Sequence, residues 1–253
     1  MNRHENTGNR LLFTAASSSI ALHLMFGQFG WFSRYEIYIW ASTLGILGYV
    51  LKPSIYSDGN GIKPHEKTIL LFAGMFLLCF PYLIVLPNIP VAAGNIYEQH
   101  YQMHRFAVEF YKKPVAANDI GYVSYLNPVY ILDLMGLASS EALLLRVHSN
   151  QKNWMDNLAK AKNVELAMIY DDWFEHIPES WIKLGELKLR NASIKLLRDK
   201  VAFYSLNADS AQEICSLLEE FAATLPAGAT FDFTGHRSDD TGNQEKSEDL
   251  LSH

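Results

Sequence analysis

Apolar residues without charges are concentrated in the first third of the chain. The segment from Leu11 to Ser33 contains no Asp, Glu, Lys or Arg, and shorter apolar runs follow it. A helix of about 20 apolar residues is long enough to cross a bilayer. The pattern therefore predicts a transmembrane region over 1–92, with spans at about 11–30, 35–51 and 68–87. A signal peptide followed by buried helices is the alternative, and three apolar runs in succession favour the spans.

Basic residues beside the apolar runs predict how this region is oriented. Arg3, Arg10, Lys52, Lys63 and Lys67 share one side of the membrane if the N-terminus is cytoplasmic. Cytoplasmic loops are enriched in Lys and Arg. We therefore expect a multi-pass protein of a bacterial inner membrane, with its N-terminus in the cytoplasm and the chain after about residue 92 in the periplasm.

Residues 93–234 alternate apolar and polar residues over short distances, as a globular domain does. Apolar residues recur every three or four positions in 94–113 and 209–224, which indicates amphipathic helices. Further helices are expected at 139–147 and 152–162, and strands at 114–118, 130–133, 164–170, 184–189 and 201–206. Strands that alternate with helices are typical of an α/β layer fold.

The expected fold class is thus a membrane α-helical anchor of about three transmembrane helices, followed by a small α/β extracytoplasmic domain. The last stretch, 235–253, is acidic and lacks apolar periodicity, so we expect a disordered tail.

Charge and cysteine content narrow the function classes. The net charge of −6 divides into +2 over 1–93 and −8 over 94–253. A nucleic-acid binder needs a clustered basic face, so nucleic acid is excluded as a partner. Cys79 lies in an apolar run and Cys215 in a polar helix pattern, which predicts neither a disulfide nor a thiolate metal site.

Polar residues follow two of the expected strands. Asn118 and Asp119 are followed by Gly121, and Asp133 is followed by Gly136. Ligand sites of α/β folds are built at the carboxyl ends of strands, so Asn118, Asp119 and Asp133 are candidate substrate-binding residues. Asn, Asp and Gly are also the residues that turns prefer, which leaves a structural role open.

Arg34 is the fourth candidate binding residue. It lies between the first two expected spans, in the aromatic sequence Trp-Phe-Ser-Arg-Tyr-Glu-Ile-Tyr. A guanidinium matches two phosphate oxygens, so Arg34 could contact the phosphate of a membrane lipid. The alternative is a charge that only marks the end of a span.

Two further pairs have the residue types of metal ligands. His100 and His104 are four residues apart and could share a helix face, but the sequence supplies no HExxH pattern around them. Asp171 and Asp172 follow an expected strand and could chelate a divalent cation, although one is better explained as a helix cap. We predict no metal site from these residues.

Several motifs resemble the C-terminal part of bacterial multi-spanning membrane glycosyltransferases of the GT-C type, the protein mannosyltransferase and aminoarabinose transferase group. The resemblance covers about 15–205, and its most specific part is the pairing of Asn118-Asp119-Ile-Gly121 with Asp133-Leu-Met-Gly136-Leu. The other matching segments are Gly30–Tyr38, Asn95–Met103 and Ile169–Phe174.

The resemblance implies a polyprenyl-phosphate sugar donor, transfer at the outer membrane face, and often a divalent cation. The family places its general base in the first outer loop of a long N-terminal bundle, and this chain has far fewer spans. The resemblance therefore implies either a truncated or split transferase component whose membrane partner supplies the missing spans, or a degenerate remnant. The alternative function is a non-catalytic membrane-anchored module that binds a glycan, lipid or protein. No residue of this chain is predicted to be catalytic.

Overall fold

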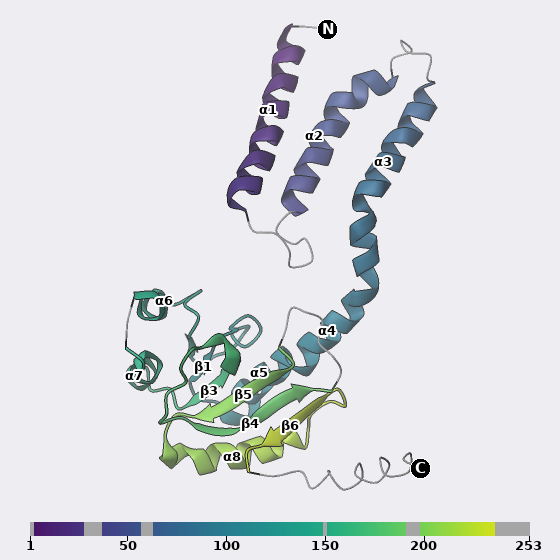
Figure 1. The fold of residues 1–253 in the computed structure, drawn as a ribbon. Helices are drawn as coiled ribbons and strands as arrows, with labels where there is room; N and C mark the ends of the chain where they lie inside the picture. The colour runs from purple at the N-terminus through teal and green to yellow at the C-terminus, as the bar shows by residue number, and fades with distance from the viewer. Residues whose placement is uncertain (1–2, 28–36, 57–62, 149–150, 191–197, 236–253) are drawn as a thin grey trace, which may run out of the picture. The chain divides into compact units, whose positions relative to one another are not determined.

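The computed structural model describes residues 3–27, 37–56, 63–148, 151–190 and 198–235 (Figure 1). Contacts divide the chain into two compact units, Met1–Ile89 and Pro90–His253, and each unit is described by itself. The expected tail at 235–253 lies almost entirely outside the described residues.

The described part of the first unit is helical. Its elements are α1 (Arg3–Phe26), α2 (Ile37–Tyr56), α3 (Pro64–Val85) and the 3-10 turn η1 (Leu86–Asn88). Helix α2 contacts both α1 and α3. His23 Nδ1 and Tyr38 Oη lie 2.9 Å apart in a hydrogen bond that joins α1 to α2.

The expected anchor of about three transmembrane helices, and with it the expected fold class, is wrong. Within the described ranges, no single helix is both long and apolar enough to cross a bilayer. The serines at 17–19 and His23 lower the mean hydropathy of α1, and the apolar helical segment Ile37–Ile46 within α2 is too short to cross a bilayer. One pair of helical segments, His65–Leu77 and Tyr82–Tyr111, meets the length and composition limits together, with a bend of 46° between them.

The second unit is an α/β domain built on a six-stranded mixed sheet. Its strands are β1 (Val115–Ala117), β2 (Ile131–Asp133), β3 (Leu166–Ile169), β4 (Ile182–Leu189), β5 (Lys200–Ser205) and β6 (Ala229–Phe233). Its helices are α4 (Ile89–Glu98), α5 (His100–Arg105), the π-helix η2 (Phe106–Tyr111), α6 (Ser140–His148), α7 (Trp154–Ala161), the 3-10 turn η3 (Asp171–Trp173) and α8 (Ala208–Ala222).

The sheet has a parallel half and an antiparallel half. Its strand order is β2-β1-β3-β5-β4-β6, in which β1 pairs parallel with β2 and β3, and every other pairing is antiparallel. Strand β6 was not expected from the sequence. It pairs with β4 through Gly185, where a β-carbon would lie 2.4 Å from the Phe231 ring, so only glycine fits there.

The strands alternate between two cores because successive side chains point to opposite faces. On β5, Val201 and Phe203 face the core formed with α5, η2 and α8, while Ala202 and Tyr204 face the core formed with α6 and α7. In α8, Ile214, Leu218 and Phe221 are buried on one face, as the helical period of this segment predicts.

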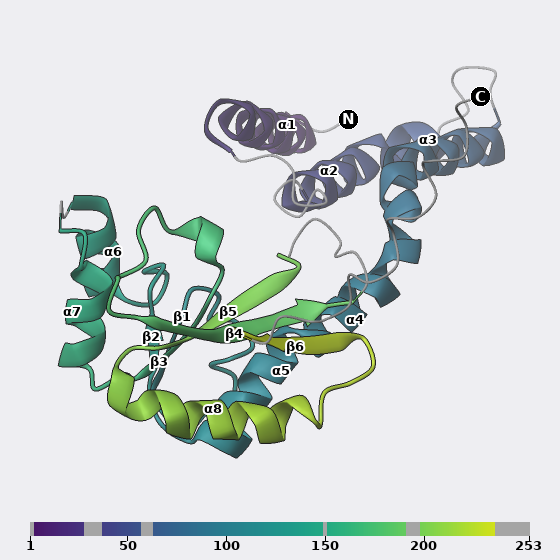
Figure 2. The ribbon, with the colours of Figure 1, turned by 60° about the horizontal axis from the view of Figure 1, so that its bottom comes forward.

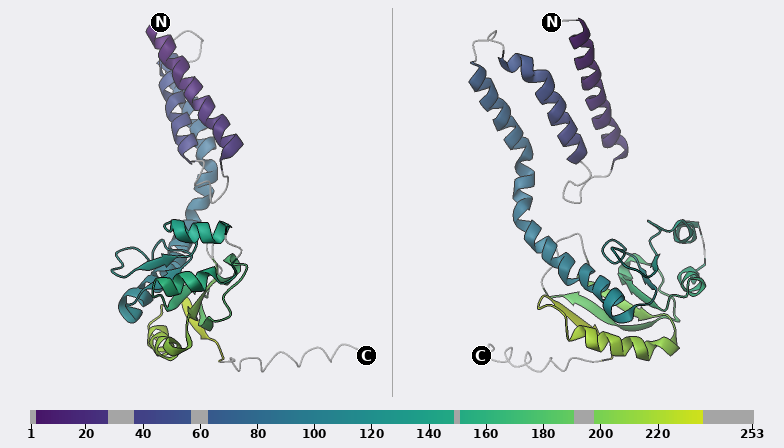
Figure 3. Two further views of the ribbon diagram at one scale, coloured as in Figure 1. Left: turned by 90° about the vertical axis from the view of Figure 1, so that its left-hand side faces the viewer. Right: turned by 180° about the vertical axis from the view of Figure 1, so that it is seen from behind.

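The two faces of the sheet are not covered equally. Helix α8 and the α5 segment lie beneath the sheet, whereas α6 and α7 lie over its β1–β3 end (Figure 2). The views in Figure 3 show the same arrangement from the side and from behind. On the α6–α7 side, the core that the described residues form includes Ala202 and Tyr204 of β5 but no residue of β4 or β6. The side chains of Glu186 and Lys188 on β4 lie outside both cores, so polar groups occupy this part of the sheet.

Candidate functional site

Asp133 ends β2 and is bonded entirely to the loop that follows it. Its Oδ1 accepts hydrogen bonds from the backbone N–H groups of Met135 at 2.9 Å and Gly136 at 3.1 Å, and its Oδ2 accepts one from Ala138 at 2.6 Å. The side chain is 2 % exposed. These bonds explain Asp133 as the residue that folds its own loop, which is the turn role left open by the sequence.

Gly136 is required by the same loop. Its φ is +79°, and a β-carbon added there would lie 2.6 Å from the backbone N and Cα of Leu143 in α6. A side chain would be strained by the backbone conformation and would also collide with α6. The spacing of Asp133 and Gly136 is therefore accounted for by the geometry of this loop.

Asn118 and Asp119 follow β1 and are bonded less completely. Asn118 is 1 % exposed, and its Oδ1 accepts a hydrogen bond from the Tyr170 backbone N–H at 3.1 Å, which ties the ends of β1 and β3 together. Asn118 Nδ2 is buried without a hydrogen-bond partner among the described residues. Asp119 Oδ1 accepts from the Gly121 N–H at 3.3 Å, and its Oδ2 lies 3.6 Å from His100 Nε2.

His100 and His104 do not face a common ligand. His100 Nε2 lies 2.8 Å from Tyr170 Oη, whereas His104 Nδ1 lies 3.4 Å from the Val123 carbonyl and its ring packs against Tyr101. Across the described ranges, no group of three or more His, Cys, Asp or Glu side chains is arranged to hold a metal ion.

Arg34 lies outside the described residues, so the structure says nothing of its predicted lipid contact.

Asp171 and Asp172 diverge at the end of β3. Asp171 Oδ2 lies 2.6 Å from Lys183 Nζ, and Asp171 Oδ1 accepts a hydrogen bond from Tyr204 Oη at 3.0 Å. Asp172 Oδ2 instead lies 2.7 Å from Arg198 Nε. The two carboxylates therefore bind different cations and do not form a chelate.

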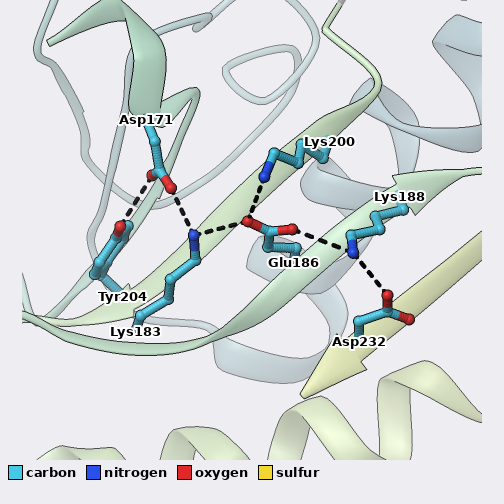
Figure 4. Close-up of polar contacts among 7 residues, drawn as sticks. All are labelled: Asp171, Lys183, Glu186, Lys188, Lys200, Tyr204 and Asp232. Atoms are coloured by element: carbon cyan, nitrogen blue, oxygen red, sulfur yellow. Dashed lines mark hydrogen bonds and ion pairs between the residues drawn. The ribbon is translucent and has the colours of Figure 1, made fainter. Parts of the chain in front are cut away.

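Asp171 belongs to a network of charges that joins the turn η3 to the polar side chains of β4, β5 and β6 (Figure 4). Glu186 on β4 is its centre: its Oε1 accepts from Lys183 Nζ at 2.7 Å and Lys200 Nζ at 2.9 Å. Its Oε2 lies 3.4 Å from Lys188 Nζ, which also contacts Asp232 Oδ2 at 2.8 Å. The network joins residues from β4, β5, β6 and the turn after β3.

These contacts shift the protonation equilibria of the network. Burial would raise the pKa of Glu186, but the hydrogen bonds and charges of Lys183 and Lys200 outweigh it and lower that pKa to about 2. Burial opposes the charge of Lys183, yet its hydrogen bonds to Asp171 and Glu186 raise its pKa. Burial, followed by the charge of Asp171, raises the pKa of Tyr204 to about 12.

A pocket of about 480 Å³ opens beside this network, and we define it as the charged pocket. It is lined by Asp171, Asp172, Glu186, Arg198, Asp199, Lys200 and Ala202. It lies where β3 ends and β5 begins, at the sheet edge formed by the carboxyl ends of the parallel strands. Sites of α/β folds form at this edge.

Of the residues that line this pocket, only Asp171 and Asp172 are candidates from the sequence alone. Glu186 and Lys188 alternate with apolar residues along β4, which is the pattern of a strand with one polar face. This alternation could have indicated a polar face on β4, but it does not identify the residues that pair with Glu186 and Lys188. Lys200 and Asp232 reach the network only through strand pairing over 14 and 46 residues of sequence from Glu186.

Comparison with known proteins gives one match. Residues 94–205 match the family described as Domain of unknown function (DUF8728). No curated protein and no solved structure matches the chain. The matched range includes Asn118, Asp133 and all the residues that line the charged pocket. The glycosyltransferase resemblance, the implied polyprenyl-phosphate donor and the membrane location stay predictions.

Proposed function

We propose that the α/β domain is a non-catalytic binding domain for a neutral, hydroxyl-rich ligand, namely a segment of a glycan, and that this ligand occupies the charged pocket. The single observation behind the proposal is the composition of that pocket: a cavity of about 480 Å³ whose wall is almost entirely charged, with its charges paired to one another.

The pairing of charges favours a neutral ligand. The network and the pocket wall together hold four cations (Lys183, Lys188, Arg198 and Lys200) and five carboxylates (Asp171, Asp172, Glu186, Asp199 and Asp232), which leaves a formal net charge of only −1 for an ionic ligand to neutralise. An ion would have to displace an existing partner and leave a charge uncompensated. Sugar hydroxyls both donate and accept, so they can use the remaining lone pairs and N–H groups without breaking the pairs.

The same contacts disfavour acid–base catalysis by the central carboxylate. General acids and bases work best when their pKa lies near the working pH. With a pKa of about 2, Glu186 stays ionised and is a weak base, and the raised pKa of Lys183 keeps that amine protonated. This supports binding over group transfer in the charged pocket.

The proposal is tested by isothermal titration of the 253-residue chain with chitotriose, a neutral oligosaccharide, and with trigalacturonate, an anionic one. We expect chitotriose to bind more tightly. Asp172→Ala removes an exposed acceptor and the partner of Arg198, so it should weaken chitotriose binding about tenfold or more.

Glu213→Ala is the matched control. Glu213 forms an ion pair with Lys113 at 2.8 Å that is comparably exposed to Asp172–Arg198 and lies on α8, beneath the sheet. Glu213→Ala should leave the affinity for chitotriose unchanged. Equal losses in the two variants, or no binding of chitotriose at about millimolar concentration, would refute the proposal.

A further inference from the structure

A buried chain of hydrogen bonds leads from His100 to the edge of the charged pocket. His100 Nε2 lies 2.8 Å from Tyr170 Oη, which donates to Gln99 Oε1 at 2.9 Å. Gln99 Nε2 donates in turn to the backbone carbonyl of Arg198 at 2.7 Å. His100, Gln99 and Tyr170 are at least nine-tenths buried, so the two bonds of Tyr170 are made away from water, and the bond to Arg198 is partly buried.

The Arg198 carbonyl at the end of the chain determines which atom is the donor in every bond. The Arg198 carbonyl can only accept, so the amide nitrogen of Gln99 must face it and the amide oxygen must face Tyr170. That oxygen also only accepts, so the hydroxyl hydrogen of Tyr170 points to Gln99. Tyr170 Oη must then accept from His100, which assigns the neutral tautomer with its hydrogen on Nε2.

Arg198 links this chain to the pocket. Its carbonyl is held by Gln99, while its guanidinium pairs with Asp172 and lines the cavity. The bond from Gln99 therefore fixes its backbone, while Tyr170 orients Gln99 and His100 in turn orients Tyr170. His100 touches none of the pocket residues itself.

The charged groups around the chain determine how it responds to acid. Asp119, from the loop after β1, faces His100 at 3.6 Å, and Tyr170 faces it from the end of β3. The charges of Asp119, Arg198 and Asp172 also act on the Tyr170 hydroxyl. Burial lowers the pKa of His100, with the charge of Asp119 opposing that shift, so the imidazole is neutral at pH 7.

Protonation of His100 would add its proton at Nδ1, while the Nε2–H stays a donor that lies 2.8 Å from Tyr170 Oη and 3.6 Å from Asp119 Oδ2. The positive charge strengthens the attraction of this N–H to the Asp119 carboxylate at the expense of its bond to Tyr170, and so weakens the chain of bonds that ends at Arg198. The pocket then loses the fixed position of one of its lining donors.

We propose that His100 is a positioning residue for the charged pocket: in its neutral Nε2–H tautomer it orients Tyr170 and Gln99 so that Arg198 is held at the pocket edge, and its protonation releases that hold. The inference rests on the proposed function for its ligand and adds a regulation to it, namely weaker glycan binding in mild acid.

The test uses His100→Gln, whose amide N–H can replace the Nε2–H donor but does not titrate. Chitotriose affinity of the wild-type chain should fall about tenfold between about pH 7.5 and the pH at which NMR of the imidazole shows His100 protonated. His100→Gln should match the wild type within about twofold at the higher pH and keep its affinity at the lower pH. His104→Gln, on the same helix but outside the chain of bonds, should behave as the wild type at both.

A readout without ligand separates this inference from the proposed function. In ¹⁵N NMR of the 253-residue chain, the Arg198 amide shift should follow the titration of the His100 imidazole, and that titration should vanish from Arg198 in His100→Gln. If chitotriose fails to bind while Arg198 still follows His100, the glycan proposal is wrong and the coupling stands. An Arg198 shift that is independent of His100 in the wild type, or retained in His100→Gln, overturns the inference.

Discussion

Two loops at the same edge of the sheet contain similar residues, but those residues have different roles. After β2, Asp133 bonds three backbone N–H groups and Gly136 packs against α6, so the loop is complete in itself. After β1, Asn118 ties the chain to β3 yet keeps Nδ2 without a partner among the described residues, and Asp119 still has an oxygen directed at His100. The comparison teaches that an Asp followed by Gly does not by itself indicate a ligand site.

The largest effect expected from this comparison is that of Gly136→Ala. The positive φ and the contact of 2.6 Å with Leu143 should together cost about 3 to 4 kcal/mol in the free energy of unfolding. Gly121→Ala, in the loop after β1, is the matched control, because its β-carbon would meet only Asp119 Oδ1, at 3.4 Å. Urea denaturation measures both, and equal costs would remove the distinction between the loops.

Asp133→Ala should have the next largest effect. It leaves three backbone N–H groups without their acceptor, and we expect a loss of about 3 kcal/mol in the free energy of unfolding. Asp119→Ala removes one long hydrogen bond at a more exposed side chain and should cost less than about 1 kcal/mol. A cost for Asp119→Ala as large as that for Asp133→Ala would show that both loops are structural.

Most helices and strands of the α/β domain were predicted better than strand β6 and the helices of the first unit. The helical period of α8 and the apolar runs of β3 and β5 are local properties, because the burial of Ile214 or Phe203 follows from residues nearby in the chain. Strand β6 was not predicted, because its short alternation of polar and apolar residues forms a strand only through pairing with β4. The apolar helices α1 to α3 were misassigned because long runs without charges were weighed above their serines and histidine.

The candidate site was predictable only in part for a similar reason. Residue type and position after a strand identify Asn118, Asp119 and Asp133, but those features are shared by turns and ligand sites. The bonds that separate the two roles come from Met135, Ala138 and Tyr170, whose backbone positions the sequence does not reveal.

Glu186→Gln tests the charged network and should change the free energy of unfolding less than the loop variants do. The change should cost about 1.5 kcal/mol at neutral pH, because three lysines lose a shared charged acceptor. The folded pKa of about 2 lies below the ordinary value of 4.5, so the stabilisation is complete above pH 4.5 and is lost as the pH falls toward 2. The stability difference between Glu186→Gln and wild type should therefore shrink over that range, whereas a constant difference would contradict the assignment.

The smallest expected effect is the pH dependence of stability that arises from His100. Its folded pKa lies below the ordinary 6.5, so in the window beneath 6.5 the unfolded chain binds more protons than the folded one. The free energy of unfolding should fall as the pH drops below 6.5, with a slope of at most about 1.4 kcal/mol per pH unit. Thermal denaturation of wild type and His100→Gln should differ in this slope; identical slopes would mean that His100 is not buried in its neutral form.

The central claim, that the charged pocket holds a neutral glycan segment, is tested most directly by mapping chitotriose onto the chain by NMR. We predict that the largest saturable shifts of backbone amides fall on Asp172, Arg198 and Lys200, with little change around Asp133. Shifts that centre elsewhere, or none at saturating probe, would contradict the account.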